Sequence, residues 1–324
     1  MRTRSPISHT VTALACALAL GAAGCRATNH PVEPADLGTP RPSAELLAVI
    51  DEPGPIQVET VAGADWEVAL SGLLNLDHPK AQTAGLEDGV EPIQVYFHAL
   101  RHPEHGLYMV DTGVERALTR PDEDAAIRGI VARFMKVEAM KVHIDTATWL
   151  SRQSQPLSGV FLTHLHLDHV SGLADVPADV PVYLGPGETA LRSVENLVVG
   201  PNLSRAAAGK GPLREWGFVP EKDGAFEAVL DVFGDGSLWA IHVPGHTPGS
   251  TAFLARTPEG PVLMVGDASH TAWGWENGVE PGSFSADQPA SAASLARLRR
   301  LAAEHRGVDV RLGHQTLGVR LARP

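Results

Sequence analysis

The chain has 324 residues, of which 44% are hydrophobic and 20% are charged, so it is long and apolar enough to form a globular domain with a sizeable core. Lys and Arg number 26 against 38 Asp and Glu, which gives a formal net charge of -12. A surface of this sign repels phosphate backbones, and no basic patch compensates for it, so nucleic acid is excluded as a partner.

The first 24 residues have the layout of a secretory signal peptide. Arg2 and Arg4 precede an apolar stretch, residues 11–23, which is too short to span a bilayer comfortably and ends in small residues. The sequence GAAGC at its end resembles a bacterial lipobox, in which Cys25 would be lipidated and would begin the mature protein. Ala22 stands where such a motif usually has leucine, so an ordinary cleaved signal with a chance cysteine is the alternative. We expect an exported bacterial lipoprotein, periplasmic or on the cell surface, that reaches the membrane only through Cys25.

Residues 25–43 are rich in proline and small polar residues, which predicts a flexible tether between the lipid and the folded domain. Residues 44–324 would then form a single domain. The only other cysteine, Cys16, lies inside the signal peptide, so the mature chain has no pair of thiols for a disulfide.

The first part of the domain has the pattern of an antiparallel meander, with strands expected at residues 56–61, 66–70, 93–100 and 107–110. Residues 121–142 predict a helix, because Ile127, Ile130, Val131 and Phe134 recur at about the helical period. His102 and His105 lie in a polar hairpin tip and are expected to be turn residues rather than ligands.

The densest group of candidate ligands follows a short apolar run at residues 159–162. The next residues, THLHLDHVSG, place four potential ligands within six positions: His164, His166, Asp168 and His169. Side chains two apart on an extended segment point the same way, so His164 and His166 can reach one metal ion, while the following turn can face a second. Imidazole and carboxylate without thiolate suit zinc, or another borderline divalent ion, in an open hydrolytic site.

Three more candidate ligands follow short apolar runs downstream: His246 in VPGHTPGS, Asp267 in LMVGDAS and His314 in VRLGHQ. Strands are expected at residues 238–243, 250–254, 262–265 and 308–312, with an amphipathic helix at 291–305. Between His169 and His246 we expect a strand at 182–184, a helix at 188–194 and a loop-rich stretch at 201–220.

The order HxHxDH, His, Asp, His resembles that of the dinuclear members of the metallo-β-lactamase superfamily, from about residue 58 onward. The resemblance implies an α/β fold, a single-domain αββα sandwich with its ligands on loops at one edge. It implies two metal sites. His164, His166 and His246 would bind one ion, Asp168, His169 and His314 would bind the other, and Asp267 would lie between the two ions. Two divalent ions, expected to be Zn²⁺, would supply a hydroxide that attacks an ester or lactone.

The resemblance also covers Asp111, in a DTG turn where the family's aspartate orients the metal-binding loop, although Asp111 could equally cap the next helix. Residues 266–294 resemble the same segment of N-acyl homoserine lactone lactonases. Those enzymes carry a tyrosine, expected to contact the lactone carbonyl, where this chain has His270. His270 could replace that hydrogen bond, act as an extra ligand or be a bystander. Asp168, Asp267 and His270 are therefore the candidate catalytic residues.

Nearby aromatic residues, Trp273, Trp275 and Phe284, could form a wall for an acyl chain or could anchor the loop to the core. The sequence predicts a metal-dependent hydrolase of a small ester or lactone, resembling quorum-quenching lactonases. One alternative is a glyoxalase II-like thioesterase, but we find no basic cluster to hold glutathione. A second is a β-lactamase-like hydrolase, which would often have cysteine in place of Asp267. A third is a metal-binding lipoprotein without activity.

Overall fold

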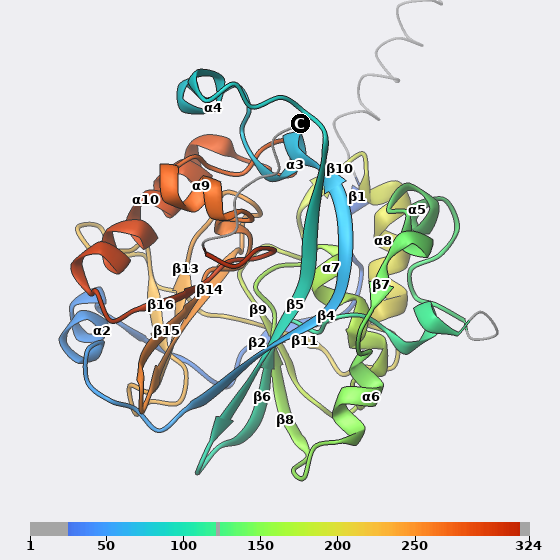
Figure 1. Cartoon of the computed structure of the whole chain (residues 1–324). Helices are drawn as coiled ribbons and strands as arrows, with labels where there is room; N and C mark the ends of the chain where they lie inside the picture. The colour runs from blue at the N-terminus through green and yellow to red at the C-terminus, as the bar shows by residue number, and fades with distance from the viewer. Residues whose placement is uncertain (1–24, 121–123, 318–324) are drawn as a thin grey trace, which may run out of the picture.

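The computed structural model describes residues 25–120 and 124–317, and in this part of the chain two mixed β-sheets pack face to face with helices on both outer sides (Figure 1). The eight-stranded sheet has the order β2-β11-β9-β8-β6-β5-β4-β7. Its strands are β2 (Val32–Pro34), β11 (Leu213–Glu215), β9 (Val182–Leu184), β8 (Leu157–Phe161), β6 (Gly106–Val110), β5 (Val90–His102), β4 (Gln57–Ala69) and β7 (Lys141–Val142).

The six-stranded sheet has the order β16-β15-β14-β13-β12-β3. Its strands are β16 (Asp309–Arg311), β15 (Gly260–Met264), β14 (Thr251–Thr257), β13 (Leu238–His242), β12 (Val229–Asp231) and β3 (Thr39–Arg41). A two-stranded sheet pairs β1 (Cys25–Arg26) with β10 (Arg192–Ser193). This architecture confirms the expected αββα sandwich.

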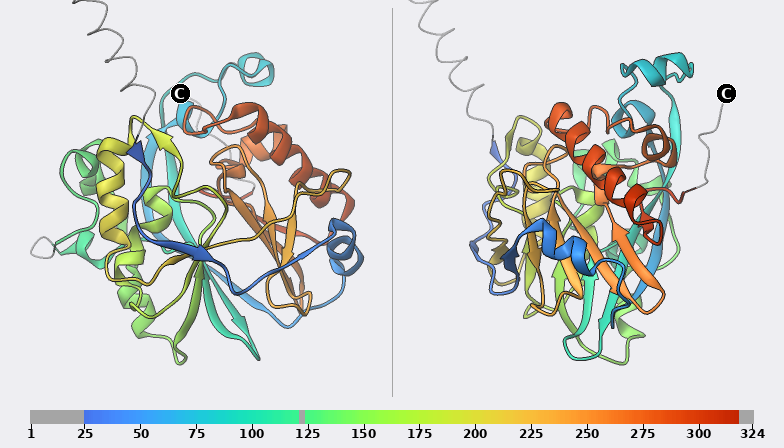
Figure 2. Two further views of the ribbon diagram at one scale, coloured as in Figure 1. Left: turned by 180° about the vertical axis from the view of Figure 1, so that it is seen from behind. Right: turned by 90° about the vertical axis from the view of Figure 1, so that its left-hand side faces the viewer.

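The helices divide between the two outer faces, as the views from behind and from the side also show (Figure 2). The eight-stranded sheet is covered by α5 (Gly129–Phe134), α6 (Thr146–Ser151), α7 (Leu167–Val170) and α8 (Asn196–Ala206). The six-stranded sheet is covered by α2 (Ser43–Val49), α9 (Ala272–Asn277) and α10 (Gln288–Glu304). Two short helices, α3 (Leu70–Leu73) and α4 (Pro79–Thr83), connect β4 to β5.

The central strands are apolar on both faces because each face meets a different part of the core. In β14, Phe253 and Ala255 face the other sheet, whereas Ala252 and Leu254 pack under the helices. Alternate side chains of a strand point to opposite sides, so a strand buried on both sides must be apolar throughout. The result is one core between the sheets and one beneath each helical layer.

The segment expected to be a flexible tether, residues 25–43, instead adds strands to all three sheets. β2 pairs with β11 in parallel, β3 pairs with β12 in antiparallel orientation, and Ala27 is buried in the core beneath α8. The proline content that predicted a tether is compatible with strands here, because β2 and β3 are edge strands whose prolines need not donate to a further strand. The folded part therefore includes residues 25–43.

The chain around α5 and α8 also differs from expectation. Residues 129–134 form a helix of six residues rather than part of one at 121–142, and the backbone turns into the left-handed region at Lys136, with φ 51°. Ile130 and Phe134 are exposed, although Ile127 and Val131 are buried as the pattern predicted. The helix expected at 188–194 is absent, and α8 occupies residues 196–206, where Pro201 had indicated a loop.

The expected signal peptide, residues 1–24 with Cys16, lies outside the described residues, as do residues 121–123 and 318–324. Cys25 is exposed at the start of β1. Within residues 25–120 and 124–317, we find no helix with the length and apolar character needed to cross a bilayer.

Candidate metal centre

The expected ligands come from loops that follow strands of both sheets. His164, His166, Asp168 and His169 lie just beyond β8, which runs parallel to its neighbours β6 and β9. Asp267 and His314 follow β15 and β16, which are also parallel to each other, and His246 follows β13. Because parallel strands end at the same edge of a sheet, the fold brings these distant loops together.

The seven expected ligands form two groups that could each hold a metal ion, and within each group the ligand atoms all lie within 4.8 Å of one another. The first group is His164, His166, His246 and Asp267, and the second is Asp168, His169 and His314. In the first group, His166 Nδ1 and His246 Nε2 are 2.8 Å apart. All seven residues that the sequence predicted as ligands are thus together at one place.

Asp267 lies between the two groups. Its Oδ2 is 3.4 Å from His246 Nε2 and 3.3 Å from His169 Nε2, and its Oδ1 is 3.4 Å from His314 Nε2. Two donors bound to one zinc ion at about 2.0 to 2.2 Å are themselves about 3 to 3.5 Å apart. The carboxylate is therefore placed to bind one ion of each group.

The residues present fit a divalent metal ion. His164 Nε2, His169 Nε2 and Asp267 Oδ1 are buried and have no hydrogen-bond partner. Buried polar atoms are normally paired, and leaving one without a partner costs about 1 to 3 kcal/mol. Two cations, one in each ligand group, would satisfy all three atoms.

The second ring nitrogen of most ligand histidines is held by another group. His169 Nδ1 donates to Asp111 Oδ2 at 2.8 Å, and His314 Nδ1 donates to the Gln94 carbonyl at 2.9 Å. His164 Nδ1 is 3.0 Å from Thr163 Oγ1, and His246 Nδ1 is 3.2 Å from Ser285 Oγ. Such contacts fix the tautomer and leave Nε2 free for a metal ion.

Asp111 is bound to the ligand loop and does not cap a helix. Its carboxylate accepts hydrogen bonds from the backbone and hydroxyl of Thr163 as well as from His169. The backbone at Asp111 has φ 58°, a left-handed conformation that is costly outside glycine, asparagine and aspartate. This geometry agrees with the orienting role expected of Asp111.

Charge divides the ligand histidines into two classes. Burial, followed by neighbouring imidazoles, holds the pKa of His164 and of His246 well below the usual value. Burial also opposes the charged form of His169 and His314, yet nearby carboxylates, chiefly Asp267, hold the pKa of His169 well above its usual value and raise the pKa of His314 to about 10. Without metal, the second group is thus the one that carries protons at neutral pH.

Glycine is required directly behind the bridging carboxylate. A Cβ atom added at Gly313 would collide with Asp267 Oδ1, and one added at Gly266, where φ is +52°, would lie 2.9 Å from Thr163 Cβ. A side chain at either position would displace a ligand or the loop that carries the ligands.

Glu188 is a buried acid at the site that the sequence analysis missed. Its Oε2 accepts from Leu165 N at 2.8 Å, between His164 and His166, and its Oε1 accepts from Gly249 N at 2.7 Å, in the loop of His246. Burial raises the pKa of Glu188 to about 7. This carboxyl joins the ligand loops of the two halves, and its only sequence signal is an acid in a glycine-rich stretch.

Of the three aromatic residues that could form a wall for an acyl chain, only Phe284 is exposed. Trp275 is buried in the core under α10, and Trp273 packs against Leu70, Leu74 and Val279, so both anchor the loop. Phe284 alone is 44% exposed, over Gly72. His102 and His105 lie at the β5–β6 hairpin beside Asp235, away from the seven ligands.

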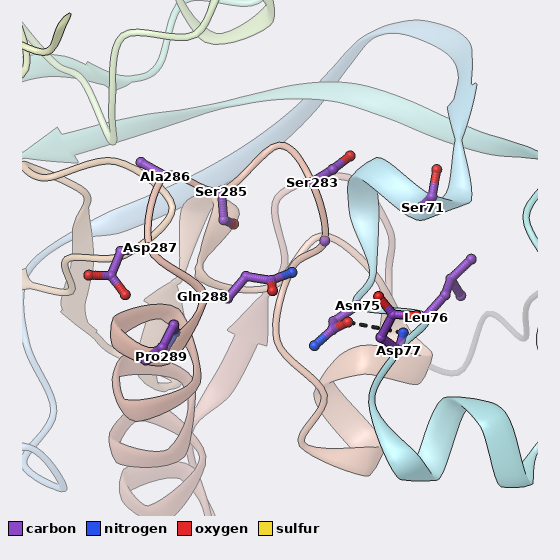
Figure 3. Close-up of a pocket in the computed structure, with 11 residues that line it drawn as sticks. Ser71, Asn75, Leu76, Asp77, Ser283, Ser285, Ala286, Asp287, Gln288 and Pro289 are labelled. Atoms are coloured by element: carbon purple, nitrogen blue, oxygen red, sulfur yellow. Dashed lines mark hydrogen bonds between the residues drawn. The ribbon is translucent and has the colours of Figure 1, made fainter. Parts of the chain in front are cut away.

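Two hollows flank the ligand set. One, of about 730 Å³, lies between residues 71–77 and 282–289, with Asn75 and Gln288 on facing walls (Figure 3). Ser285, which contacts His246, belongs to its lining. The other, of about 430 Å³, is lined by Trp66, Ile93 and Tyr96 and includes His314 itself.

Comparison with known proteins identifies the family. The family model for the metallo-beta-lactamase superfamily matches residues 90–314, a range that includes all seven expected ligands. The chain belongs to the metallo-β-lactamase superfamily. Its relatives and ligand geometry make it a metal-dependent hydrolase of that superfamily.

Among the curated relatives is N-acyl homoserine lactonase AttM of Azorhizobium caulinodans, 32% identical over 253 residues, which are 78% of this chain and 84% of that enzyme. The AttM lactonase of Agrobacterium fabrum is 33% identical over 147 residues, 45% of this chain and 54% of the relative, so this match spans about half its length. A solved quorum-quenching N-acyl homoserine lactone lactonase is 17% identical with a TM-score of 0.58, covering 84% of this chain and 100% of that one, which supports the same fold.

Replacement of the bridging carboxylate should remove metal. We expect Asp267→Ala to lose at least one of two metal ions per chain, because among the described residues no other carboxylate belongs to both a His164 group and a His314 group. Metal content after gel filtration, measured by plasma mass spectrometry, tests this, with Asp309→Ala, at an exposed position of β16, as the control. Two ions retained in Asp267→Ala would contradict the bridging assignment.

Metal binding should release protons. His169 and His314 have raised pKa values in the metal-free protein, so both are protonated at neutral pH and must lose their protons to bind metal. We expect about two protons released per chain at pH 7, and an affinity that falls as the pH is lowered from about 8 to about 6. Calorimetric zinc titrations in buffers of different ionisation enthalpy measure the number, and an affinity independent of pH would refute the charge assignment.

Proposed function

We propose that the protein is a dinuclear zinc hydrolase that opens the ring of a lactone, with N-acyl homoserine lactones as the favoured class. The observation that carries this proposal is the open set of seven nitrogen and oxygen ligands around Asp267. Two divalent ions, when bound there, supply an activated water and polarise the carbonyl of the substrate.

A substrate can reach the metal centre from one side. Five of the seven expected ligand side chains are buried, but His166 and Asp168 are only partly buried. A carbonyl arriving there meets the ligand set without displacing a core residue. Asp111 and Glu188 are buried and hold the ligand loops through hydrogen bonds to His169 and to the backbone of Leu165.

The hollows favour a neutral substrate. Neither Lys nor Arg lines the larger hollow, which has Asp77 and Asp287 in its wall. Lys141 is the one Lys or Arg among the residues that line the smaller hollow. An anionic thioester of glutathione would find little charge compensation there, whereas an uncharged lactone with an acyl chain would not need it. The lactonase relatives named above point to the same class.

A substrate panel tests the proposal. We expect the purified enzyme to convert N-acyl homoserine lactones to the ring-opened acids, faster than thioesters or β-lactams, with one proton released per turnover. A chelator should abolish the activity and Zn²⁺, Mn²⁺ or Co²⁺ should restore it. Activity that survives the chelator would refute the metal mechanism, and a preference for β-lactams would refute the substrate class.

We further propose that the protein is held at a bacterial membrane through a lipid on Cys25. The motif before this residue supports the proposal, as does its exposure at the start of β1. In cells fed a labelled fatty acid, the full chain should be labelled and should sediment with membranes, whereas Cys25→Ser should be unlabelled. Equal labelling, or none in either protein, would contradict the anchor.

A further inference from the structure

His270 lies inside the metal centre rather than at its rim. It is 2% exposed, and its Nε2 is 3.0 Å from Asp267 Oδ2, closer than any of the ligand histidines comes to that oxygen. Its ring is also perpendicular to the ring of His246, with centroids 5.0 Å apart. The imidazole therefore borders both ligand groups.

The hydrogen bond at Nδ1 of His270 shows which of its two ring nitrogens can bind a metal ion. Its Nδ1 is 3.0 Å from the carbonyl oxygen of Leu73, which can only accept a hydrogen bond. Nδ1 must therefore carry a proton, and a neutral imidazole then has a bare lone pair at Nε2. That lone pair faces the carboxylate of Asp267, and two acceptors at this distance repel each other unless a cation lies between them.

His314, an expected ligand, has the same arrangement. Its Nδ1 donates to a backbone carbonyl, that of Gln94, and its Nε2 faces Asp267. The rings of His270 and His314 are nearly parallel, at 7°, with centroids 5.6 Å apart. Ligand atoms of Asp267, His270 and His314 all lie within 4.8 Å of one another, so these three residues form a third group able to hold an ion.

We propose that His270 is an additional metal ligand that binds through Nε2, beside Asp267 and His314. The proposal rests on the metal centre of the proposed function but not on its lactone substrate. It adds an eighth protein ligand to the seven that the motif predicts. In this role Nδ1 donates to Leu73, and the ion joins the Nε2 lone pair to Asp267.

The proposal changes what the protein offers to the substrate. A tyrosine at this position would present a hydroxyl, whereas His270 has its only proton engaged by Leu73. The substrate carbonyl would then receive no hydrogen bond from position 270. The additional nitrogen ligand would instead increase the affinity of the site for the ion that His270 shares with His314.

Metal affinity tests the assignment without any substrate. We expect His270→Ala to hold one of its two ions at least 10-fold more weakly than the wild type in competition with a chromophoric chelator. The cobalt-loaded variant should also differ from the wild type in its visible absorption spectrum, because the coordination number changes. His305→Ala, which removes a histidine that pairs with Asp51 and belongs to no group of possible metal ligands, is the matched control and should bind both ions as the wild type does. Unchanged affinity and an unchanged spectrum in His270→Ala would overturn the proposal.

A measurement on the wild type guards against a variant that fails to fold. In the zinc-loaded protein labelled with ¹⁵N histidine, the His270 ring should show a proton on Nδ1 and none on Nε2. Protons on both nitrogens would mean that His270 is a charged donor to Asp267, and would overturn the proposal. Weakened metal binding in His270→Ala together with no lactone hydrolysis by the wild type would refute the substrate class and leave the ligand assignment intact.

Discussion

One buried carboxylate determines the arrangement of the centre. Asp267 Oδ2 faces four imidazoles, those of His164, His169, His246 and His270, and Oδ1 faces that of His314. An ionised carboxylate removed from water needs compensating charge, and the surrounding imidazoles hold the pKa of Asp267 well below its usual range despite burial. Protons on some of those imidazoles, or two divalent ions, can supply that charge. Only the ions also satisfy the buried nitrogens that have no partner.

The fold brings three distant segments, which carry residues 164–169, His246 and His314, to that carboxylate. Strands of both sheets end at one edge. Each sheet is packed on both faces, against the other sheet and against a helical layer, so the loops beyond the strands have little freedom to move. Asp111 then fixes His169, and Glu188 links the backbone beside His164 to the loop after His246. The two half-sites are thus connected through hydrogen bonds as well as through Asp267.

What could be predicted from the sequence was the local chemistry. Four expected ligands lie close together in the chain, and the other three each follow a short apolar strand. The sandwich predicted from this pattern is confirmed, and the seven side chains lie together in the structure. Residues 25–43 could not be placed, because their strands exist only through pairing with β10, β11 and β12, far away in the sequence. The prolines were compatible with edge strands, which composition alone does not reveal.

The role of Glu188 and the role proposed for His270 could not be predicted from the sequence for the same reason. The partner of His270 Nδ1 is the carbonyl of Leu73, 197 residues earlier, and a backbone carbonyl leaves no trace in residue identity. Glu188 likewise acts through backbone amides at Leu165 and Gly249. Side chains that act through the backbone of distant loops become visible only when the fold is known.

The central claim is that these side chains hold two divalent ions on either side of Asp267, and anomalous diffraction from crystals of the zinc-loaded protein tests it most directly. The account predicts two peaks at the zinc edge, about 3.5 to 4 Å apart, one beside His164, His166 and His246 and the other beside Asp168, His169 and His314. A single peak, or peaks elsewhere with Asp267 turned away from them, would contradict it.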